Sequence, residues 1–437
     1  MSIKHFKEYL YNLKGNMLLK VGSINAIGVL ITSLTSLISF KIIAVLLGAE
    51  GMALIGNMRN VLTTIQSGST LGLYNGIVKY VAQYKTDKKE LSAIVSTSFF
   101  ASLVVVLFLS VYLYFGSEYW NTIIFGEEFD FGYIFKIVAI VLPFYAINTL
   151  CLAVVNGFSK YKAYILLNII SSITGLFVTL FLVWKYRIDG AFFAIVLNPA
   201  ISLLITFYIL IKQTAILKSI SIHKISFKYL SRFGSYAIMA LVSSTILPVI
   251  LIRIRNFIIS VNGVDEAGYW EAMQRISNQY MMFITTLLTL YLLPKLSEVK
   301  TNKGFRSEVF NFYKIILPIF ALSFIVIYIL RSIIIKILFS NDFISMESLF
   351  SWQLGGDLFK IASLVIAHQL LAKKMFWHYI TTEIISFSIL YLLSINLIDQ
   401  YGFVGASMAY FFNYIFYFFM IIMIFRKQLF GSKIKIR

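Results

Sequence analysis

Hydrophobic residues along this chain come in runs of about 20, the length that an α-helix needs to cross the hydrocarbon core of a bilayer. Short polar segments separate the runs, and proline is rare, so that long helices are not interrupted. The pattern predicts an all-α polytopic membrane protein. Its twelve expected spans are residues 21–47, 53–84, 91–115, 132–157, 163–184, 189–211, 234–261, 267–294, 310–334, 349–372, 376–398 and 402–425.

Polar residues interrupt the second predicted span at helical spacing. One stripe, on one side of a helix that turns about 100° per residue, contains Gly72, Asn75, Gly76 and Lys79. Arg59 belongs to an earlier stripe of the same span. A charged side chain inside a bilayer is costly unless it faces protein or water. We expect Gly68 and Gly72 to break the helix, which would bring both stripes to one cavity.

Several later spans also carry polar residues. The eighth span has Glu271, Gln274, Arg275 and Asn278, and the tenth has Asp357 and Lys360. Glu271 and Arg275 are four residues apart, in the order that favours a helical ion pair. Lys41 is a single charge in the first span. In the seventh span, Arg253 and Arg255 point to nearly opposite sides, so at most one of them easily lines a shared cavity, and Pro248 is expected to kink the helix.

Composition and charge agree with a membrane protein. The 437 residues are 59% hydrophobic and 13% charged, whereas a soluble domain carries about 25% charged residues. A net charge of +19 would suggest nucleic acid, but lysine and arginine are concentrated in alternate loops. This distribution follows the positive-inside rule. It predicts that both termini are cytoplasmic and that the partners are membrane lipids, with no nucleic acid.

Neither a metal site nor a catalytic site is expected. The chain has one cysteine, Cys151, and four histidines without ligand spacing. It has no glycine-rich nucleotide loop and no arrangement of nucleophile, histidine and acid, so we expect no enzyme and no cofactor. An acidic outer loop with Glu127, Glu128 and Asp130 leaves one alternative open, a membrane polymerase or glycosyltransferase.

A faint repeat suggests two halves. The segments GAFFAIVLN (190–198) and GASMAYFFN (405–413) share the spacing of glycine, alanine and asparagine. We expect two six-helix bundles, residues 1–211 and 234–437, joined by a basic cytoplasmic linker at 212–233. Because six is an even number, the bundles would have the same orientation and a pseudo-twofold axis along the membrane normal. Chance similarity between apolar helices is the alternative.

The charges inside the spans are mostly positive, which suits an anionic cargo. A drug or cation antiporter should instead have a cavity dominated by acids. Two structural interpretations stay open: Lys41, Lys79 and Arg253 could extend to the headgroups. The pairs Glu271–Arg275 and Asp357–Lys360 could be neutralised structural pairs.

Three segments carry a resemblance to a known family. They are LLGAEGMALIGNMRNVLTTIQSGSTLGLYNGIVKYVAQYK (46–85), AGYWEAMQRISNQYMMFITTLLTLYLLPKLSE (267–298) and LFSWQLGGDLFK (349–360). They resemble the Wzx-type flippases, the polysaccharide branch of the multidrug/oligosaccharidyl-lipid/polysaccharide exporter superfamily. The resemblance implies a bacterial inner-membrane protein with two bundles around a central cavity. Its cargo would be an undecaprenyl-diphosphate-linked oligosaccharide, moved to the periplasmic leaflet by alternating access.

For the cargo, the resemblance favours an O-antigen repeat unit, with the lipid III of enterobacterial common antigen as the alternative. We expect substrate contacts from Lys41, Arg59, Asn75, Lys79, Arg255, Glu271, Gln274, Arg275, Asn278, Asp357 and Lys360, and hinges or close packing at Gly72, Gly76 and Pro248. Polymerase and chain-length proteins are the expected further partners. Coupling to protons or to the membrane potential would drive transport.

Overall fold

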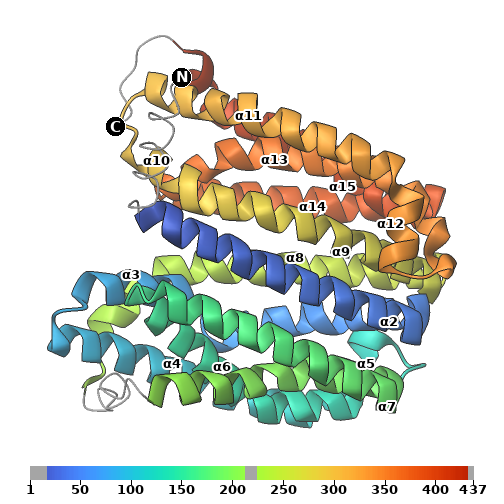
Figure 1. The fold of residues 1–437 in the computed structure, drawn as a ribbon, viewed down its shortest axis with the longest axis horizontal. Coiled ribbons are helices and arrows are strands. Elements are labelled where there is room, and N and C mark those ends of the chain that lie inside the picture. Colours follow the sequence, from blue (N-terminus) through green and yellow to red (C-terminus); the bar gives the residue numbers. More distant parts are fainter. Residues whose placement is uncertain (1–16, 212–223, 432–437) are drawn as a thin grey trace, which may run out of the picture. The chain divides into compact units, whose positions relative to one another are not determined.

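The computed structural model describes residues 17–211 and 224–431 as a succession of helices (Figure 1). The helices of the first half are α2 (Met17–Ser69), α3 (Tyr74–Tyr84), α4 (Lys88–Phe115), α5 (Ser117–Phe125), α6 (Gly132–Gly157) and α7 (Tyr161–Ile211). They are followed by α8 (Phe227–Asn262), α9 (Val264–Leu287), a π-helical stretch (Leu288–Leu292), α10 (Leu293–Glu298), α11 (Asn302–Ile329), α12 (Arg331–Leu338), a 3₁₀ stretch (Asn341–Leu349), α13 (Phe350–Ala372), α14 (Phe376–Tyr401) and α15 (Val404–Phe430). The predicted all-α polytopic class is confirmed. The predicted terminal positions and residues 212–223 of the predicted linker lie outside the described residues.

Within the described residues, nine helical segments are long and apolar enough to cross a bilayer. Two of them contain one residue with a non-helical backbone, Gly48 (φ 67°) in α2 and Arg187 (φ 53°) in α7. Each of these long segments therefore consists of two helical stretches, and glycine suits the positive φ at position 48. The more polar α9 is not among the nine. The count of twelve spans stays a prediction.

The predicted break in the second span is confirmed. The helix α2 ends at Ser69, and the backbone turns through Leu71 (φ 51°) and Gly72 (φ 61°) before α3 begins. The amide of Gly72 donates to the carbonyl of Ser67 at 3.1 Å, which closes the end of α2. Glycine is favoured in this left-handed conformation at a helix end. The predicted span 53–84 is consequently two helices.

The chain forms two compact units, and neither is one continuous stretch. Unit 1 comprises Met1–Ile42, Ile65–Ile123 and Glu127–Ala240, and unit 2 comprises Ile43–Thr64, Ile124–Gly126 and Leu241–Arg437. The second part of α2 thus belongs with the C-terminal helices, and α8 contributes to both units. The predicted division at 211 and 234, with its pseudo-twofold axis, stays a prediction.

In unit 1, the helix α6 packs against α3, α4 and α7. Ile77 of α3, Ile94 of α4 and Ala153 of α6 are fully buried in the same apolar cluster. The cluster also buries Tyr229 at the start of α8, whose hydroxyl donates to Glu90 of α4. Lys228 also pairs with Glu90 at 3.4 Å, and the Ser226 amide donates to Thr97 Oγ1 at 2.9 Å, so several contacts hold the start of α8 in unit 1.

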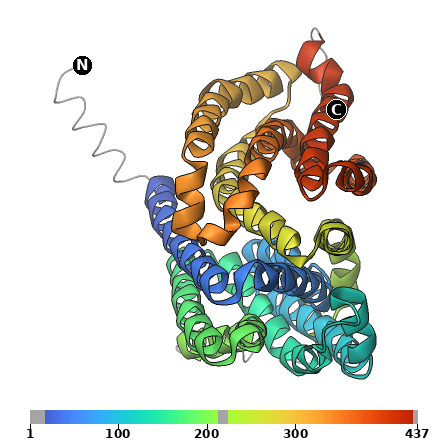
Figure 2. The same ribbon diagram turned by 90° about the vertical axis from the view of Figure 1, so that its right-hand side faces the viewer.

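In unit 2, the helix α13 is central, because it packs against α9, α11, α14 and α15. Figure 2 shows these helices nearly end-on, coloured from yellow to red. At one end of the unit, Lys373 donates from Nζ to the carbonyl of Val299 at 2.6 Å, and Arg306 donates to the carbonyl of Gly431 at 2.7 Å. These bonds bring together the loops that we predict to be cytoplasmic.

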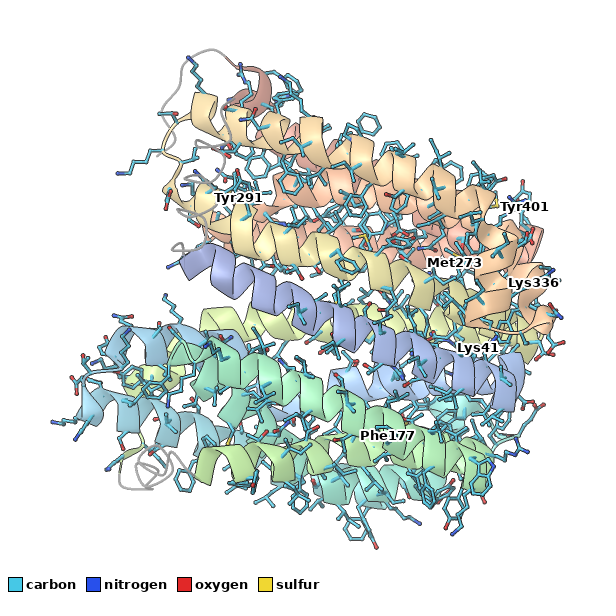
Figure 3. All side chains as sticks on the ribbon, in the orientation of Figure 1. Lys41, Phe177, Met273, Tyr291, Lys336 and Tyr401 are labelled. Carbon is cyan, nitrogen blue, oxygen red and sulfur yellow. The ribbon has the colours of Figure 1, made fainter. Side chains whose placement is uncertain are left out.

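The opposite end of unit 2 carries different groups. Tyr269 of α9 packs edge-on against Phe343 and Phe403, with ring centroids 5.7 and 6.1 Å away. The acidic residues near this end include Asp265, Glu266 and Asp342, which interact electrostatically with Tyr269. In Figure 3, Lys336 and Tyr401 lie at this end and Tyr291 lies toward the other. Cations lie at this end too, with Arg331 paired to Glu347 at 3.3 Å, and which end faces the cytoplasm stays a prediction.

The second part of α2 crosses α9 at Gly268. A Cβ atom at this position would lie 2.0 Å from the backbone carbonyl oxygen of Ala49, which no side-chain movement can relieve. We expect Gly268→Ala to lower the free energy of unfolding by about 1–3 kcal/mol, since overpacking at a backbone contact forces the helices apart. Thermal unfolding of the detergent-solubilised protein measures the effect. Gly68→Ala is the control, because its Cβ would meet only Leu109 at 3.8 Å, and an equal loss there would contradict the prediction.

Candidate functional site

Arg255 of α8 is buried in unit 2 with 1% of its surface exposed. Its Nη1 donates to the Asn57 side-chain oxygen at 2.7 Å, and its Nη2 donates to Glu271 Oε2. Its guanidinium carbon lies 5.3 Å from the centre of the Trp270 ring, which adds a cation–π contact. Contacts on α2 and α9 thus fix the orientation of this arginine.

Arg275 of α9 binds the other oxygen of the same carboxylate. Its Nε donates to Glu271 Oε1 at 2.7 Å, which confirms the predicted pair. Arg59 of α2 interacts electrostatically with both Glu271 and Arg275. We call these four residues the arginine cluster: Arg59, Arg255, Glu271 and Arg275. It holds three guanidinium groups and one carboxylate, so that it carries an excess of positive charge in a largely buried position.

Backbone proximity and two asparagines make this cluster possible. A Cβ at Gly56 would lie 2.6 Å from the Glu271 carboxyl group, so that a larger residue here would displace this carboxyl group from its place beside α2. Asn57 donates from Nδ2 to Asn256 Oδ1 at 2.8 Å and to the Ile124 carbonyl at 2.9 Å. Sequence reasoning missed Gly56, Asn57 and Asn256. In the sequence, Gly56 and Asn57 lie just before Arg59, and Asn256 follows Arg255. A small or polar residue close to a predicted intramembrane arginine is the feature that could have identified them.

A second polar cluster surrounds Asp357 of α13, which is fully buried. Its carboxylate accepts hydrogen bonds from Ser277 Oγ at 2.8 Å, from the Tyr280 hydroxyl, from the Tyr410 hydroxyl at 2.6 Å and from Gln353 Nε2 at 3.4 Å. We call this set the Asp357 network. It connects α9, α13 and α15 through one carboxylate.

The predicted residues Gln274 and Lys360 lie beside the Asp357 network. Gln274 donates to Gln353 Oε1 at 3.1 Å. Lys360 donates from Nζ to the Tyr410 hydroxyl at 3.1 Å, and its ammonium lies over the rings of Tyr410 and Tyr414. The structure therefore joins Asp357 and Lys360 through a tyrosine, and no direct salt bridge between them is formed.

The other predicted residues lie elsewhere. Lys41 lies half-buried on α2 within unit 1 (Figure 3), and Lys79 of α3 is exposed with its ammonium 5.2 Å from the Tyr80 ring. Asn278 of α9 is exposed. Asn75 belongs to α3, and Pro248 lies inside α8. Their roles in substrate binding or hinging, and that of the buried Gly76, stay predictions.

The expected difference between the two arginines of the seventh span is confirmed. Arg255 is buried and Arg253 is exposed on the same helix.

For the described residues, we find no group of three or more His, Cys, Asp or Glu side chains that could hold a metal ion. Cys151 is a buried free thiol. The arginine cluster has the donors that suit an anion, because guanidinium groups bind carboxylate and phosphate oxygens in pairs.

The fold is that of a polytopic helical membrane protein with a buried cluster of arginines. The same architecture occurs in the lipid II flippase MurJ in an inward closed conformation, with a TM-score of 0.73 over 93% of this chain and 87% of that chain, at 16% sequence identity.

The sequence comparisons then give the family. Residues 18–300 match the family described as "Polysaccharide biosynthesis protein", and the chain belongs to this family. The chain is 31% identical to the lipid III flippase of Escherichia coli (strain K12), over 86% of its own length and 91% of the relative. It is 23% identical to a Shigella flexneri protein named "Putative O-antigen transporter", over 88% and 92% of the two chains. The family resemblance expected from the sequence is confirmed.

Proposed function

We propose that this protein is a flippase that moves an undecaprenyl-diphosphate-linked oligosaccharide, an O-antigen repeat unit, from the cytoplasmic to the periplasmic leaflet of the bacterial inner membrane. The arginine cluster is the observation that carries this proposal. A diphosphate with several sugars cannot cross hydrocarbon unassisted, because its charges and hydroxyls would lose their hydration. Three guanidinium groups around one carboxylate supply replacement partners for phosphate oxygens.

Alternating access is the proposed mode of transport. The diphosphate enters the arginine cluster from the cytoplasmic side, with Lys41 and Lys79 as further cations on its path. Asn75, Gln274 and Asn278 supply hydrogen bonds to the sugars. The polyprenyl chain stays in the lipid. Gly72 and Gly76, and Pro248 in α8, are the proposed hinge or close-packing positions for this motion.

The lipid III of enterobacterial common antigen is a second candidate cargo, which the 31% identity to a lipid III flippase favours. Complementation separates the two. The gene is expressed in one strain that lacks its O-antigen flippase and in another that lacks its lipid III flippase. Restoration of the O-antigen alone supports the first cargo, and restoration of the common antigen alone supports the second.

The arginine cluster predicts a difference between neighbouring arginines. We expect Arg275→Ala to slow translocation at least about tenfold, because a charge-assisted hydrogen bond contributes about 1.5–3 kcal/mol. Arg253→Ala is the matched control, since Arg253 is exposed on α8 and lies outside the cluster. The measurement is the rate at which a labelled lipid-linked oligosaccharide becomes accessible in the outer leaflet of proteoliposomes that contain equal amounts of folded protein.

Equal rates for the two variants would contradict the proposal. Cells that express Arg275→Ala should accumulate single repeat units in the inner leaflet, whereas a blocked polymerase would leave them in the outer leaflet. A loss of drug resistance with normal surface glycan would instead favour a multidrug antiporter.

On this proposal the protein carries out no covalent chemistry and needs no cofactor. The energy comes from the membrane potential or from coupled protons. Glu383 of α14, whose carboxylate accepts from the Tyr417 hydroxyl at 3.3 Å, and Asp357 are the candidate proton carriers. Polymerase and chain-length proteins would act on the cargo after release.

A further inference from the structure

The arginine cluster contains one negatively charged group, the carboxylate of Glu271. Glu271 is 7% exposed, and the two oxygens of its carboxylate bind different arginines, Oε2 to Arg255 and Oε1 to Arg275. We propose that Glu271 occupies the diphosphate site of the empty transporter and leaves it when the cargo binds. This inference rests on the proposed function.

The Glu271 carboxylate lies between two guanidinium groups, a position that also suits a phosphate group. Arg275 donates from Nε at 2.7 Å, and its Nη2 lies 2.7 Å from the same oxygen. The Nε–H group makes the hydrogen bond, and both nitrogens are donors that suit phosphate oxygens. A diphosphate has more oxygens and more negative charge than a carboxylate, so it can displace Glu271 from both arginines, whereas a weaker anion cannot.

Arg255 has two partners besides Glu271 that would keep it in place after Glu271 leaves. Arg255 keeps the Asn57 oxygen at 2.7 Å and the Trp270 ring at 5.3 Å. Asn57 is in turn held by Asn256 and by the Ile124 carbonyl. Arg255 therefore stays oriented without its carboxylate and can present Nη2 to an incoming phosphate.

The side of the cluster that faces α2 is closed. A Cβ at Gly56 would lie 2.6 Å from the Glu271 carboxyl group and 2.9 Å from the guanidinium carbon of Arg255. The carboxyl group consequently cannot move closer to α2, so it leaves the two arginines by turning away from that helix. An internal competitor of this kind gives specificity, because every ligand must exceed the affinity of Glu271 before it binds.

The test measures binding of farnesyl diphosphate, an isoprenyl diphosphate that is soluble in detergent, to the purified full chain. We expect Glu271→Gln to bind it about tenfold more tightly than the wild type, since a neutral amide no longer competes for two arginines. Glu347→Gln is the control. Glu347 forms a partly exposed pair with Arg331 at 3.3 Å, outside the cluster, and its loss should leave the affinity unchanged.

Each outcome decides the inference. Tighter binding by Glu271→Gln supports it, and so does binding by this variant when the wild type binds nothing. Equal or weaker binding by a folded variant overturns the inference and leaves the proposed function intact. Absence of binding by both proteins overturns both. If Glu271→Gln does not fold, Glu271→Asp replaces it, because a shorter side chain cannot bridge both arginines. No gain in affinity there also overturns the inference.

Discussion

Replacing Asp357 by alanine is expected to lower the free energy of unfolding by about 3–5 kcal/mol, because each buried donor that is left without an acceptor costs about 1–3 kcal/mol. The fully buried carboxylate accepts from Ser277, Tyr280, Tyr410 and Gln353. The variant leaves these donors without an acceptor. It also removes the negative charge that stabilises the Lys360 ammonium through the Tyr410 hydroxyl.

The measurement is thermal unfolding of detergent-solubilised protein. Asp357→Asn should lose less stability than Asp357→Ala, because the amide oxygen still accepts hydrogen bonds. Glu347→Ala is the control, since a partly exposed ion pair contributes at most about 1 kcal/mol. A melting temperature for Asp357→Ala that matches this control would show that the network does not stabilise the fold. The geometry points to a positioning role for Asp357, which orients the α9 face that also carries Gln274.

The parts of the site that sequence could predict are local. Glu271 and Arg275 are one helical turn apart, so their pairing depends on a single helix. Arg253 and Arg255 are two residues apart, so helical geometry alone places them on opposite sides. The break after Ser69 was visible because glycines interrupt a long apolar run. In each of these cases, the interaction is determined by residues within a few positions of each other.

The parts that sequence could not predict depend on distant segments. Asn57 and Asn256 are separated by 199 residues and meet only because α2 and α8 pack together. Gly56 looked like an ordinary small residue, and its importance comes from the close approach of Glu271. Tyr410 lies in an apolar aromatic stretch, where nothing marks it as the partner of Asp357. Tertiary packing decides these contacts, and periodicity carries no information about it.

The membrane potential is expected to shift the final distribution of cargo between the leaflets by about a thousandfold at 100 mV. Moving one charge across this potential changes the free energy by about 2.3 kcal/mol, so a dianionic headgroup gains about 4–5 kcal/mol on leaving a negative compartment. A tenfold change in the ratio corresponds to about 1.4 kcal/mol. This gain alone would make export favourable.

The experiment uses proteoliposomes with a potassium gradient and valinomycin, at equal pH on both sides, and follows exposure of the headgroup to an external enzyme. A potential that is negative inside should move the cargo outward, and reversing the potential should move it inward. Arg275→Ala is an informative control. The substitution should slow the approach to the final ratio of cargo between the leaflets without changing that ratio. A changed ratio would mean that the number of ions moved with each cargo has changed. A final ratio that ignores both potentials would mean that two positive charges cross with each headgroup. In that case the potential is not the driving force, and a gradient of the accompanying cation, such as the proton, would have to supply the energy.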